Sequence, residues 1–136
     1  MIDARVQAGD FDPGRQLARL EELKSAAVAS FTGQLRVGDE VEAVHVDHYS
    51  ALARAELARV AGEAEARWSL AGVILIHRHG SFAPCDRLAF AGVAAESAAT
   101  ALDACAFLAE ALRTRAPFWR KELLAGGGAR WHEGGR

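Results

Sequence analysis

The sequence predicts an α+β fold in which about three amphipathic helices pack on a mixed, mostly antiparallel sheet. Residues 71–77 form a continuous apolar run of strand length, which is typical of a central strand covered on both faces. Residues 49–68 place apolar side chains every three or four positions, which predicts a helix. Residues 118–124 and 129–133 flank a glycine-rich turn and predict a C-terminal hairpin. The 136 residues suit one domain spanning residues 1–136.

The first third of the chain is predicted to form, in order, a strand, a helix and two further strands. Residues 5–9 favour a short strand, and the following aspartates with Pro13 favour the start of a helix that runs to about Leu23. Residues 26–33 and 41–47 are predicted as two strands around a turn at residues 37–39.

The remaining elements follow from hydrophobic spacing. Residues 87–93 predict a strand beside the one at residues 71–77. A helix over residues 96–113 is expected to pack on the sheet, and Pro117 limits its extension. The predicted apolar stripe of that helix comprises Ala101, Leu102, Cys105, Leu108 and Leu112.

Composition narrows the classes of function. The chain is 51% hydrophobic and 25% charged with a net charge of −2, which indicates a packed globule without the overall field that gathers nucleic acid or anionic lipid. The strongly apolar stretch at residues 71–76 is too short to cross a bilayer, and the N-terminus lacks the order of a secretory signal. These features predict a cytoplasmic protein.

Histidines and cysteines offer only weak signals. His45 and His48, and His77 and His79, have spacings seen in metal sites, but no adjacent cysteine or acidic cluster completes a set of ligands. Ordinary hydrogen-bonding histidines at strand ends are the favoured alternative, so no metal is expected. The two cysteines form no CxxC motif, which argues against a zinc ribbon or a disulfide framework.

The most informative segment is residues 113–122, where four cations lie beside two aromatic residues and a proline. Guanidinium groups suit phosphate or carboxylate, and a lysine among cations can have a lowered pKa that favours a nucleophilic amine. Basic residues are also common at the C-terminal ends of helices, where they oppose the helix dipole. Composition alone leaves both interpretations open.

Several ordered motifs resemble the large catalytic subunit of molybdopterin synthase, the MoaE family. The matching stretches, written with their residue numbers, are FTG 31–33 with Arg36, DHY 47–49, EAEARW 63–68, IHRHG 76–80, RAPFWRKE 115–122 and RW 130–131. They occur in family order over most of the chain, and the tract at residues 114–122 is the most specific.

The resemblance implies an α/β hammerhead fold, a central homodimer and two copies of a small ubiquitin-like subunit, MoaD. The C-terminal Gly-Gly thiocarboxylate of that subunit would enter a pocket and supply sulfur to cyclic pyranopterin monophosphate, with no separate cofactor. The catalytic candidates implied are Lys121, Arg120 and Arg113. The substrate-binding candidates are Gln34, Leu35, Arg36, Ser97, Ala98, Arg113, Arg120, Lys121 and Glu122. The candidate pocket for the partner's tail comprises Phe31, Arg115, Pro117, Phe118 and Trp119.

The sequence departs from the family pattern at several of these positions. The family usually has lysines where Arg113 and Arg120 stand, and a histidine-arginine pair where Ser97 and Ala98 stand. Arginine keeps the charge but cannot act as an amine nucleophile or base near neutral pH. Lys121 is the remaining amine of the cluster, but in a strand it would face away from Arg120.

Three functions are therefore weighed. The first is a molybdopterin synthase large subunit that uses Lys121 or arginine-assisted chemistry. The second is a catalytically impaired relative that binds a ubiquitin-like partner as a scaffold or regulator. The third, a generic phosphate binder, explains the basic cluster but not the ordered motifs.

Overall fold

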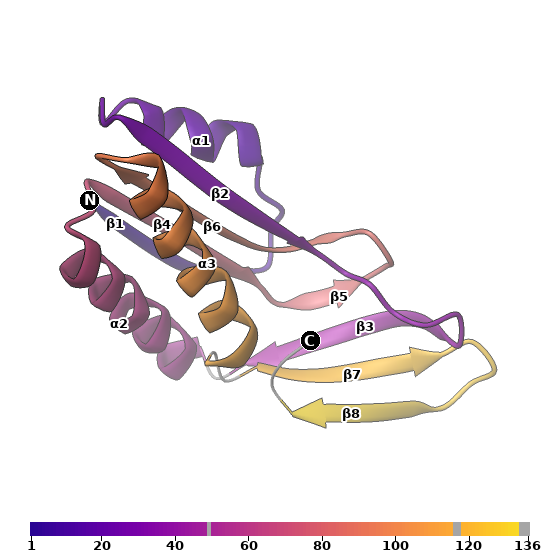
Figure 1. Cartoon of the computed structure of the whole chain (residues 1–136). Coiled ribbons are helices and arrows are strands. Elements are labelled where there is room, and N and C mark those ends of the chain that lie inside the picture. Colours follow the sequence, from indigo (N-terminus) through magenta and orange to yellow (C-terminus); the bar gives the residue numbers. More distant parts are fainter. Residues whose placement is uncertain (49, 116–117, 134–136) are drawn as a thin grey trace.

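The computed structural model describes residues 1–48, 50–115 and 118–133 as two four-stranded sheets and three helices (Figure 1). The α+β class predicted from the sequence is confirmed, and the strands divide into two sheets. In chain order, the elements are β1 (Ile2–Gln7), α1 (Pro13–Glu21), β2 (Ala27–Gln34), β3 (Val41–His48), α2 (Ser50–Trp68), β4 (Gly72–Arg78), β5 (Gly80–Phe82), β6 (Arg87–Ala95), α3 (Ala98–Thr114), β7 (Phe118–Leu124) and β8 (Ala129–Glu133).

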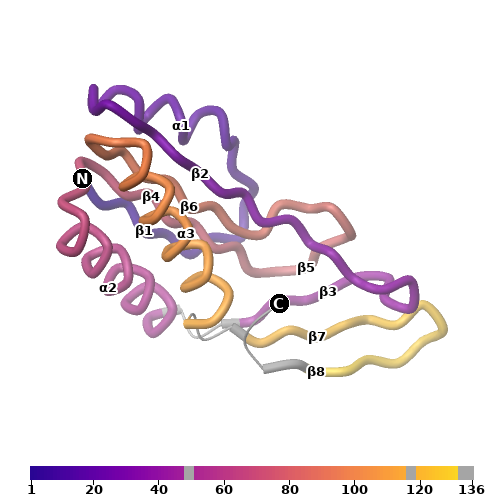
Figure 2. The backbone as a smooth tube through the Cα atoms, in the orientation of Figure 1, coloured from indigo at the N-terminus to yellow at the C-terminus, as the bar shows by residue number. Residues whose placement is uncertain are grey.

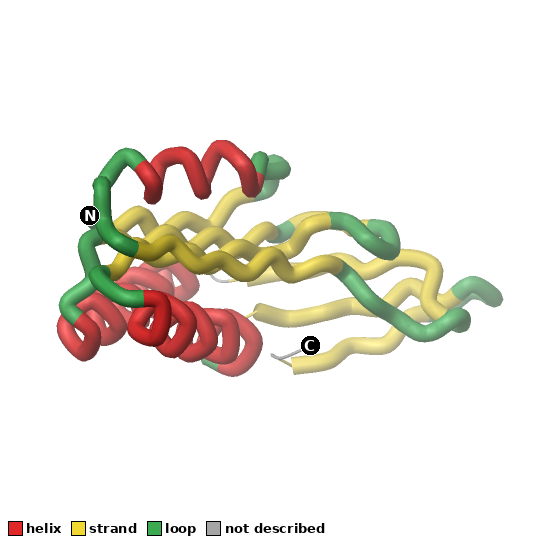
Figure 3. Tube along the Cα trace, turned by 45° about the horizontal axis from the view of Figure 1, so that its top comes forward, coloured by secondary structure: helices red, strands yellow, loops and turns green. Residues whose placement is uncertain are grey.

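The first sheet, here called the core sheet, has the strand order β1-β4-β6-β2. β1 and β4 are parallel, and the other pairs are antiparallel. Figure 3 shows α1 on one face of this sheet and the two long helices, α2 and α3, on the other. The core sheet is therefore the middle layer of three.

β4 shows why the apolar run forms a central strand. Successive side chains point to opposite faces of a strand. Val73 and Leu75 pack with the side chains of α2 and α3, whereas Ile74 and Ile76 pack with Phe11 and Leu20 on the α1 side. Because both faces are covered, every position of this run must be apolar, and the prediction of a strand buried on two sides is confirmed.

The second sheet, here called the outer sheet, has the order β5-β3-β7-β8. Val44 and Val46 of β3 are buried in the main core. The opposite face carries Trp119, Leu123 and Trp131, which are 39%, 37% and 54% exposed. The predicted C-terminal hairpin is confirmed as β7 and β8.

The chain passes from one sheet to the other after β2. Figure 2 shows β2 running along the core sheet and continuing into β3 at the far end of the molecule. The turn near residues 37–39 lies between strands as predicted, but β2 pairs with β6, while β3 pairs with β5 and β7. The two strands therefore do not form a hairpin.

Two helix predictions need comment. α1 begins at Pro13 and is capped by Asp12, whose side chain accepts hydrogen bonds from the amides of Gly14 and Arg15. In α3, four of the five residues predicted for the apolar stripe are buried, but Leu102 is 64% exposed. It directly follows Ala101, so it is rotated away from the sheet, and Ala104 and Ala111 complete the buried face instead.

Within the described residues, no helix combines the length and the hydropathy required to span a membrane.

Candidate functional site at the junction of the sheets

A pocket of about 670 Å³ lies where the end of β2 meets the outer sheet. We call it the junction pocket. It is lined by Phe31, Thr32, Gly33, Gln34, Arg36, Val37, Gly38 and Arg120. Arg36 and Arg120 come from segments more than eighty residues apart, and the fold brings their cationic side chains to one cavity. Phe31, Gln34, Arg36 and Arg120 were predicted for the site, so the structure brings four of the candidates together.

The end of β2 gives this pocket its shape. A register irregularity between Gly33 and Gln34 interrupts the pairing of β2 with β6. The ring of Phe31 lies over Gly33, where an added Cβ would approach the ring to 3.2 Å. Only glycine leaves this aromatic ring undisturbed.

Leu35 was predicted to bind substrate, but its side chain does not line the junction pocket. Its side chain is 2% exposed and belongs to the main core. Its backbone amide donates to the carbonyl of Asp86 at 2.8 Å, and its carbonyl accepts from the amide of Cys85 at 2.9 Å. Leu35 therefore anchors the segment that presents Arg36.

Arg120 supplies the second cation from β7. Its Nε is buried and has no hydrogen-bond partner among the described residues. Burial lowers the pKa of its guanidinium, and the nearby Glu122 carboxylate acts in the opposite direction. A buried, unsatisfied donor is costly, and an anionic ligand in the pocket would offset part of that cost by Coulombic attraction. Arg36 is exposed and forms no ion pair with any described residue.

Lys121 and Glu122 lie outside the lining of the junction pocket. Lys121 points to the opposite face of the outer sheet from Arg120, with its Nζ 5.5 Å from the centre of the Trp131 ring. Glu122 accepts a hydrogen bond of 2.8 Å from Nε of Arg130. Because successive side chains of a strand point to opposite faces, Lys121 and Arg120 are separated although they are adjacent in sequence.

Arg113 and Arg115 are engaged elsewhere. Nε of Arg113 donates to Glu110 at 3.2 Å within the last turns of α3, and this interaction raises the pKa of Arg113. Nη2 of Arg115 donates to Glu63 of α2 at 2.6 Å. Neither Arg113 nor Arg115 lines the junction pocket, and Arg115 connects α3 to α2.

Ser97 and Ala98 lie at the other end of α3. The Ser97 hydroxyl accepts a hydrogen bond from the amide of Thr100 at 3.2 Å and caps the helix. A helix of 17 residues is roughly 25 Å long, so these two positions are distant from Arg113 in the same chain. Within one chain, the structure does not bring them to the junction pocket.

The other candidates for the tail pocket are divided. Phe31 lines the junction pocket, whereas Trp119 lies on the exposed face of the outer sheet with Lys121. The backbone of Phe118 begins β7, and Pro117 lies outside the described residues. Thr32, Gly33, Val37 and Gly38 line the pocket but were not predicted as site residues; the signal available was their position beside Phe31 and Arg36.

Histidines and cysteines contribute no metal cluster among the described residues. Nδ1 of His45 lies 3.1 Å from the hydroxyl of Ser81, and Nε2 lies 3.3 Å from Asp47. His77 is buried with Nδ1 2.9 Å from the carbonyl of Arg78. Cys105 is buried in the core, where desolvation raises its pKa to about 11, whereas Cys85 is exposed.

Fold and site together define an α+β protein with an arginine-lined pocket, suited to an anion, at the junction of two sheets. The family model described as "MoaE protein" matches residues 6–115. The molybdopterin synthase catalytic subunit of Pseudomonas aeruginosa is 39% identical over 96% of this chain and 89% of its own length. That of Salmonella typhimurium is 39% identical over 98% and 92%.

Solved structures agree with these sequence relatives. The molybdopterin biosynthesis MoaE protein of Burkholderia ambifaria is 33% identical and aligns with a TM-score of 0.86 over 100% of this chain and 92% of its own. The chain belongs to the MoaE family.

Proposed function

We propose that this chain is the catalytic subunit of a molybdopterin synthase, acting in the cytoplasm. In this proposal it transfers sulfur from the C-terminal thiocarboxylate of a MoaD-like small subunit to cyclic pyranopterin monophosphate, and no resident cofactor takes part. Arg36 and Arg120 bind the phosphate and the negative charge that develops during transfer. The observation that carries the proposal is the convergence of these two cations on one pocket in a MoaE-family chain.

The chemistry assigned to the two arginines is electrostatic. Fixed cations in a partly desolvated pocket stabilise an anionic transition state more strongly than the same charges in water. Arg120 is half-buried, and its guanidinium remains protonated near neutral pH even though burial lowers its pKa. We assign it to charge stabilisation instead of nucleophilic attack.

We also propose that the working unit contains two copies of this chain, each with its own small subunit. Ser97 follows Ala95, which pairs with Ala27 at the start of β2, whereas the junction pocket lies at the other end of that strand, so Ser97 and Ala98 can approach a junction pocket only from a second copy. Light scattering of the purified chain tests this proposal, and a mass of one copy at micromolar concentration contradicts it.

A second candidate function has its own supporting observation. No lysine lines the junction pocket within the described residues, and Lys121 faces the other side of the outer sheet. If the reaction requires an amine in the pocket, the chain binds the small subunit as a scaffold without turnover.

The test is a reconstituted assay. Purified chain is mixed with a thiocarboxylated MoaD-type subunit and cyclic pyranopterin monophosphate, and formation of the dithiolene pterin is followed. We expect turnover by wild type, a loss of about 100-fold or more in Arg120→Ala by analogy with removal of an oxyanion-stabilising donor, and retention of much of the activity in Arg120→Lys.

Lys121→Ala is the matched variant on the other face of the same strand. If Arg120 acts as proposed, Lys121→Ala keeps activity within a few-fold of wild type. Loss of product only in Lys121→Ala would reassign the reactive amine to Lys121. Stable binding of the small subunit with no product from wild type would support the scaffold.

A further inference from the structure

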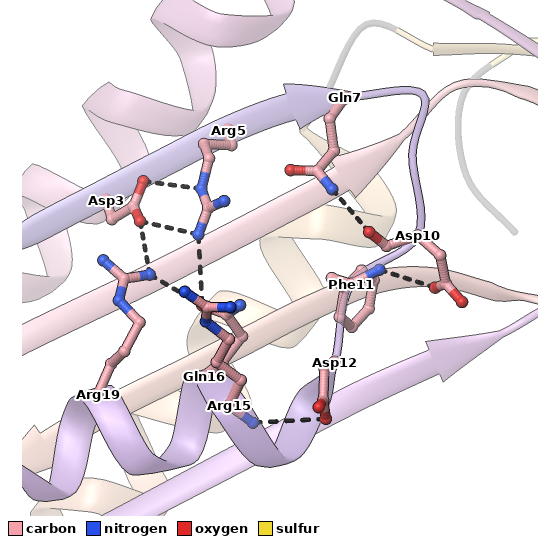
Figure 4. Close-up of a pocket in the computed structure, with 9 residues that line it drawn as sticks. All are labelled: Asp3, Arg5, Gln7, Asp10, Phe11, Asp12, Arg15, Gln16 and Arg19. Carbon is pink, nitrogen blue, oxygen red and sulfur yellow. Dashed lines mark hydrogen bonds and ion pairs between the residues drawn. The ribbon is translucent and has the colours of Figure 1, made fainter.

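A second pocket lies between β1 and α1, on the face of the core sheet opposite α2 and α3. We call it the β1–α1 pocket; its volume is about 570 Å³. Figure 4 shows the polar side chains of β1 and α1 meeting across it. Its lining residues are Asp3, Arg5, Gln7, Asp10, Phe11, Asp12, Arg15, Gln16 and Arg19. None of them belongs to the junction pocket.

Two arginines in this pocket share one carboxylate. Nη2 of Arg5 and Nη1 of Arg19 lie 2.9 Å and 2.8 Å from the same oxygen of Asp3. Both guanidinium groups also donate to Oε1 of Gln16, at 3.3 Å and 2.8 Å. Gln16 is 5% exposed and carries no charge, so two adjacent cations are held by a single negative charge. Like charges this close favour a further anion.

Arg15 adds a third cation from α1. It lies one turn before Arg19, so the two side chains project from the same face of the helix. Arg15 is exposed and forms no ion pair with any described residue. It also stands in the first turn of α1, where the helix dipole disfavours a positive charge. Helix stability therefore does not explain an arginine at this position, but a bound anion would.

The remaining aspartates are occupied. Asp10 accepts from the amide of Phe11 at 2.8 Å and pairs with Arg87 at 2.9 Å and Arg78 at 3.7 Å. Asp12 accepts from the amides at the start of α1.

The charge count follows from these contacts. Five arginines in or beside the pocket face three aspartates, which leaves a positive excess. Asp12 already accepts hydrogen bonds from the amides at the start of α1. The attraction for an anion therefore comes from the arginine side chains and not from these amides.

We propose that the β1–α1 pocket is a second anion site, which binds the phosphate group of a small phosphorylated ligand through Arg5, Arg15 and Arg19. The guanidinium fork matches phosphate oxygens and forms two parallel hydrogen bonds to them. The proposal does not depend on the function of the junction pocket, because the two pockets share no residue.

The experiment is a titration of 15N-labelled protein with inorganic phosphate, followed by amide and arginine Nε chemical shifts at fixed ionic strength. We expect saturable shifts at the amides of Gly14, Arg15 and Gln16 and at Nε of Arg5 and Arg19. Phosphate in the junction pocket would instead shift the amides of residues 31–38, so the two sites are read separately. Chloride at the same ionic strength is the reference titration.

Arg15→Gln is the decisive variant, since its side chain makes no ion pair whose loss would disturb the fold. We expect it to weaken phosphate binding at the β1–α1 pocket by about tenfold, the equivalent of one charge-assisted hydrogen bond. Arg54→Gln, which removes an exposed helical arginine outside both pockets, should leave the affinity unchanged.

Three results would overturn the proposal: shifts that do not saturate, equal shifts with chloride, or equal weakening by the two variants. A repeat with glycerol phosphate and with acetate separates a phosphate site from a general carboxylate site. Binding of acetate as tight as that of phosphate would contradict the assignment of a phosphate ligand.

Discussion

The core sheet and the outer sheet differ in how they are covered, and the difference decides where the cost of a substitution is largest. The core sheet lies between α1 and the pair α2 and α3, and its central strand is buried on both faces. The outer sheet has one face in the core and one face with exposed tryptophans. Side chains that build the core therefore concentrate in the first sheet, while the second exposes Trp119 and Trp131 on its open face.

The largest expected difference between the sheets is in core packing. Leu75→Ala removes a fully buried side chain from β4 and should lower the free energy of unfolding by about 2–5 kcal/mol, through lost burial and the cavity that remains. Leu123→Ala removes a partly exposed side chain from β7 and should change it by less than about 0.5 kcal/mol. Urea unfolding measures both, and similar losses would refute the contrast.

Thiol reactivity gives the next largest contrast. Cys105 lies on the buried face of α3 with its pKa raised to about 11 by burial, whereas Cys85 lies exposed in the turn before β6. At pH 8 only about one Cys105 thiol in a thousand would be ionised. We expect iodoacetamide to modify Cys85 at least about 100-fold faster, measured by mass spectrometry of digested protein. Comparable rates would show that α3 opens readily from the core sheet.

Helix α3, one of the helices that cover the core sheet, is stabilised by the residue that caps its N-terminus. Ser97→Ala removes the acceptor for the Thr100 amide and should cost about 1 kcal/mol of unfolding free energy. Ser97→Asp should keep most of the stability because aspartate caps a helix comparably. Thermal unfolding of both variants tests this. Equal destabilisation by alanine and aspartate would mean that the hydroxyl acts other than as a cap.

The smallest expected effect concerns acid pH at the edge of the core sheet. The Phe11 amide, with Arg87 and Arg78, lowers the pKa of Asp10. A carboxyl whose pKa falls on folding stabilises the protein above its unfolded value of about 3.9, and this contribution is lost as the pH falls through the folded value. Because Asp10 is exposed, Asp10→Asn should cost less than about 0.5 kcal/mol at pH 6.

Melting temperatures of wild type and Asp10→Asn between pH 6 and pH 2 check this sign. The difference between the two proteins should shrink as the pH falls, and a difference that grows in acid would contradict it.

Much of the fold was predictable because its signals are local. The continuous run of β4 and the spaced apolar residues of α2 each determine one element by periodicity. The assignment of β2 and β3 to separate sheets was not predictable, because strand pairing depends on partners distant in sequence. β5, with three residues, is too short to show a period.

The candidate site was predictable where the family motifs reach it and not elsewhere. The resemblance pointed to Arg36 and Arg120, which share the junction pocket. It also grouped Arg113 and Ser97 with them, although these two residues lie at opposite ends of α3. The β1–α1 pocket was missed because its arginines are spread over β1 and α1 and only the folded chain brings them together.

The backbone bonds of Leu35 have a practical consequence for spectroscopy. They join the segment carrying Arg36 to the turn that contains Cys85. Since Cys85 is the more accessible of the two thiols, a fluorophore or spin label can be attached there without any mutagenesis. The labelled residue would lie outside the junction pocket, with its backbone amide hydrogen-bonded to the carbonyl of Leu35, between the pocket residues Gln34 and Arg36. Ligand occupancy then becomes an optical or magnetic signal from the natural sequence.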